Sequence, residues 1–186
     1  DVVIENSNSG SVGDATVGDS VIITALGSAN VTIQADETIT LNGTADSLGA
    51  IDITWSNNTT LTLDAGDDIL GNAGAQINST NSGSNFTAIV MEANLDGGTG
   101  NFSGIDLNDV DVTAVSGNIT LEGEGGDTAS DRGIRIRQGT VIETTGTDGN
   151  AGNITITGTG GSETGTATEA IQFANTSVVR TDAGSI

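Results

Sequence analysis

The chain has 186 residues, with 25 acidic side chains against four arginines and a formal net charge of −21. This charge repels nucleic acids and anionic membrane surfaces, and no apolar stretch approaches the roughly 18 residues of a membrane helix. Cysteine, histidine and proline are absent, so disulfides cannot stabilise the fold. The apolar residues lie in short β-branched runs, which indicates a folded all-β chain rather than a disordered one.

A cassette of strands recurs along the chain. Its clearest strand alternates apolar and polar residues, the pattern of a strand with one buried face, at Val31–Ile33, Leu61–Leu63, Ile105–Leu107, Ile134–Ile136 and Ile171–Phe173. A leading strand is expected before each, at Val21/Ile23, Ile51/Ile53, Ile89/Met91, Ile119/Leu121 and Ile154/Ile156. A third strand is expected after each, at Ile39, Ile69, Thr113, Ile142 and Val179. No window has clear helical spacing, so we expect no helix.

A repeated strand–turn–strand cassette is typical of a solenoid. Strands that all run in one sense form a three-sided coil when successive turns stack in parallel, about 4.8 Å apart. We therefore predict an all-β fold, a right-handed parallel β-helix with three strands per turn, about five turns and uncapped ends. Residues 1–186 would form one segment. Aligning the turns on their clearest strands predicts one interior column of Ile33, Leu63, Leu107, Ile136 and Phe173.

The open ends of stacked strands pair readily with other strands. No capping segment is evident at either end of the sequence. We therefore expect the partners to be flanking coils of a longer polypeptide or identical copies stacked end to end. Joining the termini supports this expectation, because Ala183–Ile186 followed by Asp1–Ile4 repeats the leading-strand pattern of Ala151–Ile156.

Several runs carry a family resemblance: Ser116–Leu121, Gly133–Ile136, Gly139–Thr145 and Gly152–Thr157. They resemble the coils of filamentous haemagglutinin-like proteins, the large β-helical exoproteins and adhesins of Gram-negative bacteria, often exported by two-partner secretion. The resemblance is best from about residue 110 to the C-terminus. It implies a shaft segment of an adhesin. The acidic, Thr-, Asn- and Gly-rich composition also favours a secreted or surface-displayed bacterial protein.

Carboxylates gather at one predicted corner. Aligning the turns stacks Glu37, Asp67 and Asp111, and Asp64 and Asp68 lie close by. Carboxylates spaced about 4.8 Å apart repel one another unless a cation or salt offsets them, and Ca²⁺ takes oxygen ligands. The sequence therefore predicts a candidate Ca²⁺ corner at these residues. A solvated acidic corner without an ion is the other interpretation.

Other functions are less favoured. The alignment pairs Arg135 with Asp106 and Arg132 with Glu169, which indicates ion-pair ladders rather than a site for an anionic sugar. Some polysaccharide lyases and glycosidases are β-helices, but this chain lacks lysine and histidine and has few aromatic residues to stack a sugar ring. We therefore expect no enzymatic activity. The alternative to a shaft is a module that binds a cell-surface glycan or receptor through the loops at 92–103, 122–132 and 157–169.

Overall fold

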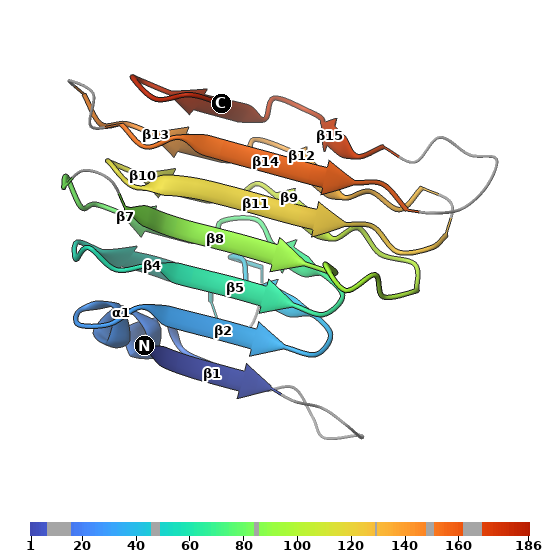
Figure 1. The fold of residues 1–186 in the computed structure, drawn as a ribbon, viewed down its shortest axis with the longest axis horizontal. Helices are drawn as coiled ribbons and strands as arrows, with labels where there is room; N and C mark the ends of the chain where they lie inside the picture. The colour runs from blue at the N-terminus through green and yellow to red at the C-terminus, as the bar shows by residue number, and fades with distance from the viewer. Residues whose placement is uncertain (7–15, 46–48, 84–85, 129, 148–150, 162–168) are drawn as a thin grey trace.

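The computed structural model describes residues 1–6, 16–45, 49–83, 86–128, 130–147, 151–161 and 169–186. The fold is all-β, with 44% of the chain in strands and 5% in a helix. Three parallel sheets build it (Figure 1). Among the described residues, no helix has the length and apolar character needed to cross a membrane.

We number the sheets in the order in which the chain enters them. Sheet 1 runs β1 (Val2–Asn6), β2 (Val31–Ala35), β5 (Leu61–Ala65), β8 (Thr87–Ala93), β11 (Asn118–Glu124), β14 (Ile154–Thr159). Sheet 2 runs β3 (Ile39–Leu41), β6 (Ile69–Gly71), β9 (Ile105–Asn108), β12 (Ile134–Arg137), β15 (Ile171–Phe173). Sheet 3 runs β4 (Asp52–Trp55), β7 (Gln76–Ser79), β10 (Asp111–Ala114), β13 (Val141–Thr144), β16 (Val178–Thr181).

From β2 onward the chain visits sheets 1, 2 and 3 in that order repeatedly, and we call each set of three strands a pass. Figure 1 shows the strands of sheet 1 as a ladder, with the two termini at opposite ends of the stack. Because every pass lies in register on the one before it, the arrangement is consistent with a parallel β-helix.

Stacked aliphatic side chains fill the interior between the sheets. Alternate residues of each strand face inward, as the period of two requires. One buried column of sheet 1, for example, runs Val31, Leu61, Ile89, Ile119 and Ile154. Burying such side chains stabilises the fold by about 1.5–3 kcal/mol each.

The interior column predicted from the sequence is wrong. Ile33 and Leu63 lie on sheet 1, whereas Leu107, Ile136 and Phe173 lie on sheet 2. The apolar-polar-apolar pattern is the same on both sheets, so the pattern alone does not distinguish them. The alignment therefore placed the first two cassettes one strand out of step with the rest.

A helix, α1 (Asp19–Leu26), stands where a leading strand was expected at Val21/Ile23, and that expectation is wrong. The helix packs against β4 of sheet 3 and buries Ile22 and Leu26. The N-terminal end is therefore not uncapped, because α1 covers its sheet 3 side.

Contacts from the first pass hold the carboxyl end of α1. The Thr59 Oγ1 donates to the Leu26 carbonyl oxygen at 2.6 Å, and the Asn57 Nδ2 donates to the Gly27 oxygen at 2.8 Å. The indole of buried Trp55 donates to the Thr59 oxygen at 3.1 Å. The first two bonds satisfy carbonyl groups that a helix end leaves unpaired, and the third holds Thr59 in place.

Gly117, Gly152 and Gly184 stack at the corner where the chain enters sheet 1. A Cβ on Gly152 would lie 2.0 Å from the Gly117 oxygen, and one on Gly184 would lie 2.2 Å from the Gly152 oxygen. The passes approach too closely here for any side chain. Just beyond, the Ile154 N–H donates to the Ser185 oxygen at 2.8 Å, so Ser185 lies beside the start of β14.

Candidate functional site

The structure separates the residues of the predicted Ca²⁺ corner. Glu37 and Asp67 do lie on successive passes between sheets 1 and 2, where the Asp67 N–H donates to the Glu37 oxygen at 3.0 Å. Asp111 instead begins β10 on sheet 3, beside Gln76 and Val141. The prediction that Asp111 shares their corner is wrong, because it depended on the out-of-step alignment. Within the described ranges, no group of three acidic side chains is placed to hold a metal ion.

Asp68 is the buried member of that set, with 8% of its surface exposed. Its Oδ1 accepts a hydrogen bond from the Thr38 Oγ1 of the previous pass at 2.5 Å. Burial raises the pKa of the Asp68 carboxyl group; the Thr38 bond opposes the rise, and the charges of Asp67 and Asp106 add to it. The group joins two passes, and its proton is held more tightly than that of an exposed aspartate.

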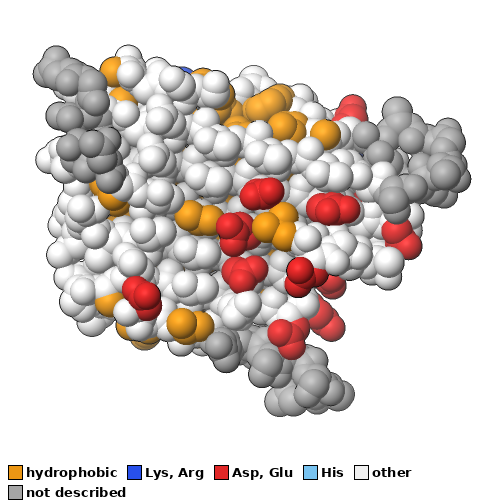
Figure 2. Space-filling model, in the orientation of Figure 1, with side chains coloured by type: hydrophobic (Ala, Val, Ile, Leu, Met, Phe, Trp, Pro, Cys, Tyr) orange, Lys and Arg blue, Asp and Glu red, His pale blue; other side chains and the backbone are white. Residues whose placement is uncertain are grey.

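A row of carboxylates lies on the outer face of sheet 1. Asp64, Glu92 and Glu122 are in register on β5, β8 and β11, and we call them the acidic row. The Gln34 Nε2 donates to the Asp64 Oδ2 at 2.9 Å from one side. Burial raises the pKa of Glu92, and its neighbours Asp64 and Glu122 raise it further. Figure 2 shows acidic side chains gathered on this face. The sequence pattern points to Asp64 but not to Glu92 or Glu122.

Both predicted arginine pairs are confirmed. The Arg132 Nε lies 2.8 Å from the Glu169 Oε2, and the Arg135 Nη1 lies 3.7 Å from the Asp106 Oδ2. Arg137 adds a fork that sequence analysis missed, with its Nε 2.9 Å and its Nη2 3.1 Å from the two oxygens of Asp106. Such forked bonds are the stronger kind of arginine–carboxylate contact.

The fourth arginine, Arg180, places its Nη2 2.7 Å from the Oε1 of the nearly buried Glu143. Every arginine thus has a carboxylate partner, and the chain contains no lysine or histidine. An anionic ligand would therefore find no unpaired cationic side chain on the molecule.

The loops that follow sheet 1 in two successive passes bond to each other. The Gly100 N–H donates to the Asp127 Oδ1 at 2.9 Å, and the Asp127 N–H returns a bond to the Gly100 oxygen at 3.0 Å. The Gly126 N–H donates to the Phe102 oxygen at 3.0 Å. These loops therefore extend the stacking beyond the strands and form a structured surface.

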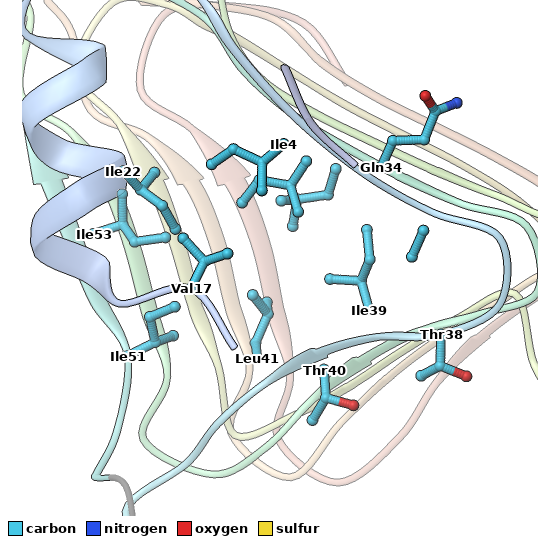
Figure 3. Close-up of a pocket in the computed structure, with 13 residues that line it drawn as sticks. Ile4, Val17, Ile22, Gln34, Thr38, Ile39, Thr40, Leu41, Ile51 and Ile53 are labelled. Atoms are coloured by element: carbon cyan, nitrogen blue, oxygen red, sulfur yellow. The ribbon is translucent and has the colours of Figure 1, made fainter. Parts of the chain in front are cut away.

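The surface of the described residues has two hollows, one apolar and one acidic. The apolar cavity, of about 120 Å³, lies at the N-terminal end and is lined by Ile4, Val17, Ile22, Ile39, Leu41 and Ile53, among others (Figure 3). The acidic groove, of about 440 Å³, is lined by residues that include Asp36, Asp64, Leu95 and Asp96. Carboxylates are the only ionisable groups in the groove, since the chain lacks histidine, lysine and cysteine.

Comparison with known proteins identifies no relative. No protein-family model, curated protein or solved structure matches the chain. The resemblance to filamentous haemagglutinin-like proteins therefore stays a prediction from runs such as Gly152–Thr157.

Proposed function

We propose that the chain is a structural shaft segment, a right-handed parallel β-helix of about five three-strand turns. It would space or present other modules of a secreted or surface-displayed, adhesin-like bacterial protein. One observation carries the proposal: three parallel sheets stack in register around a continuous aliphatic core. Bending such a stack strains the hydrogen bonds of all three sheets together, so the segment resists bending.

The surface chemistry supports the same proposal. Every arginine is engaged in an ion pair, and the acidic row is a repetitive outer face of which only Asp64 lines the acidic groove. A formal charge of −21 suits a salty medium, because the Debye length falls from about 8 Å at physiological salt to about 3 Å at 1 M. The haemagglutinin-like runs favour an extracellular setting.

Hydrogen exchange and limited proteolysis test the shaft. Amides of the middle passes should be protected in all three sheets alike, and proteases should cut only in loops, because each strand is bonded on both sides. Small-angle scattering should give the same dimensions at about 0.15 M and about 1 M NaCl. Fast exchange throughout one sheet, or a molecule that expands at low salt, would contradict a rigid segment.

A glycan- or receptor-binding module is the second candidate, and the bonding between the loops around Gly100 and Asp127 favours it. A shaft should keep its stability and its presentation of attached modules when exposed side chains of the 95–103 loop, such as Leu95 and Thr99, are replaced by alanine. A binding module should lose adhesion to its target cells. A screen on acidic and neutral polysaccharides separates both from an enzyme.

A further inference from the structure

Asparagine stands in one short motif more often than the composition alone requires. Ten of the 17 asparagines begin an Asn-X-Ser/Thr sequon, the acceptor motif of N-linked glycosylation. Serine and threonine make up 44 of the 186 residues, so only about four such sequons would arise by chance. The fold decides which of them present an amide and a hydroxyl group to solvent.

Three sequons, 30–32, 118–120 and 153–155, lie at the corner where the chain enters sheet 1, and we call them the corner sequons. Their middle residues, Val31, Ile119 and Ile154, are buried in the core. Because side chains alternate along a strand, the asparagine and the threonine of each sequon share the outer face. β2 and β11 each lie between two other strands, and Ser185 borders the start of β14. Their exposure therefore does not depend on the ends of the stack.

Each corner asparagine uses its side-chain oxygen to join two passes. The Oδ1 atoms of Asn30, Asn118 and Asn153 accept from the N–H groups of Thr60 at 3.0 Å, Asn153 at 2.8 Å and Ser185 at 2.9 Å, respectively. Their Nδ2 atoms have no hydrogen-bond partner among the described residues. Asn30 and Asn153 are exposed, and Asn118 is half-buried. A sugar on Nδ2 would leave Oδ1 in place, so the bond between passes would survive the modification.

The threonine hydroxyls of the corner sequons are also unengaged. Within the described ranges, no hydrogen bond involves the Oγ1 of Thr32, Thr120 or Thr155. The strand needs only a β-branched side chain at this position, since Val90 occupies the same row on β8. The hydroxyl that a sequon requires is therefore open to a transferase.

The sequon at 57–59 has the opposite arrangement. Its Asn57 Nδ2 donates to the Gly27 oxygen at 2.8 Å, and its Thr59 Oγ1 donates to the Leu26 oxygen at 2.6 Å. Both groups that define the motif thus hold the carboxyl end of α1. The folded chain offers neither of them to an enzyme, which makes this sequon an internal control.

We propose that Asn30, Asn118 and Asn153 are acceptors for N-linked sugars transferred from a nucleotide-activated hexose. The Nδ2–C1 bond forms as the C1–O bond to the nucleoside diphosphate breaks, and one Nδ2 proton passes to a base of the transferase. Neighbouring strands lie about 4.8 Å apart, close to the width of a sugar ring, so the site takes single sugars rather than branched glycans on adjacent passes. This modification goes beyond the shaft function and does not depend on it.

Mass spectrometry of the protein from the cells that produce it naturally tests the assignment. Peptides with the corner sequons should carry the mass of single sugars, and the peptide with Asn57 should carry none. The folded full chain, incubated with a purified asparagine glycosyltransferase and UDP-glucose, should be modified at Asn30 and Asn153 faster than at Asn57. Unfolding the chain in urea before a brief reaction should reduce this difference, because the Asn57 bonds are then lost.

Matched variants separate the sequon from the strand. T155V keeps the β-branched shape without the hydroxyl, whereas T155S keeps the hydroxyl without the branch. T155V should slow transfer to Asn153 at least about tenfold and leave Asn30 unchanged, and T155S should stay close to wild type. N153D keeps the Oδ1 acceptor for Ser185 but should take no sugar at this position. Thermal unfolding checks that each variant folds.

Three results would overturn the inference. The first is a natural protein without sugar at the corner sequons. The second is transfer to Asn57 of the folded chain as fast as to Asn153. The third is T155V modified as fast as wild type, which would show that the motif is not what the enzyme reads.

Discussion

We predict that Asn94 stabilises the whole fold by binding two loops together. Its side chain follows β8 and is completely buried. Its Nδ2 lies 3.3 Å from the Gly98 oxygen, 3.2 Å from the Glu124 oxygen and 3.4 Å from the Gly125 oxygen, and its Oδ1 accepts from the Gly98 N–H. Its φ of 56° lies in the left-handed region, which asparagine adopts more readily than most residues.

The cost of N94A follows from these contacts. Each lost hydrogen bond contributes about 0.5–1.5 kcal/mol, and more where a buried partner stays unpaired. An alanine in the left-handed region costs about 1–2 kcal/mol. N94A should therefore lower the free energy of unfolding by roughly 3–5 kcal/mol. N94G should cost about 1 kcal/mol less, because glycine adopts this conformation without strain. N94D places an oxygen against carbonyl oxygens and should cost at least as much as N94A.

Urea unfolding followed by circular dichroism measures these differences. N81A is the matched control, because Asn81 also bonds a turn and the neighbouring pass, at 2.6 Å to the Gly83 N–H and 2.9 Å to the Ser56 oxygen, but is only half-buried. It should cost about 1 kcal/mol or less. If N94A costs no more than N81A, or if N94G is less stable than N94A, the reasoning from buried bonds and backbone strain is wrong.

Three further predictions concern the core and the charges. S79A should be neutral or stabilising by up to about 1 kcal/mol in urea unfolding, because the buried Ser79 Oγ has no partner and Ala114 fills the same column one pass later; a loss above that amount would reveal a bond to the hydroxyl. The raised pKa values of Asp68 and Glu92 favour the folded state below about pH 3, where both groups are protonated in either state, and this contribution is lost as pH rises through the folded-state values. E92Q should therefore raise the melting temperature at pH 7 and have little effect near pH 4; an equal gain at both would show that charge is not the cause. Millimolar Ca²⁺ should stabilise the chain no more than Mg²⁺ at equal ionic strength, whereas a Ca²⁺-specific rise in stability that D67N abolishes would establish a Ca²⁺ site at Asp67.

The alternating apolar pattern predicts the all-β class and the stacked parallel strands, because both depend on side-chain period alone. It does not predict which sheet each strand joins. β7 has a single large apolar residue, Ile77, so the third strand of its pass goes unnoticed and Ile69 is taken for that strand. The helix is missed for a different reason. Val21 and Ile23 alternate as in a strand, while the buried residues Ile22 and Leu26 are four apart, and two residues are too few to outweigh that pattern.

Whether the positions of the charged groups are predicted correctly depends on the same alignment of the strand cassettes. Arg135 and Asp106 lie on adjacent passes where the cassettes are correctly in step, so their pairing is predicted and observed. Glu92 lies in a leading strand of the alignment, whereas Asp64 follows a second strand, and yet both belong to sheet 1. A row across the strands of sheet 1 is therefore visible only once the register is known, because each member is a separate, ordinary carboxylate in the sequence.

The placement of the termini at opposite ends of the stack has a mechanical consequence. A load applied between them pulls the terminal pass away from a single neighbour, while the passes behind it stay intact. A pass contains 28 to 35 residues, as the separations of Leu61 from Ile89 and of Ile119 from Ile154 show, and it releases roughly 90–125 Å of chain when it detaches. A tether built this way would keep its length up to a threshold force and then lengthen by one pass at a time, which absorbs a sudden pull without breaking the covalent chain.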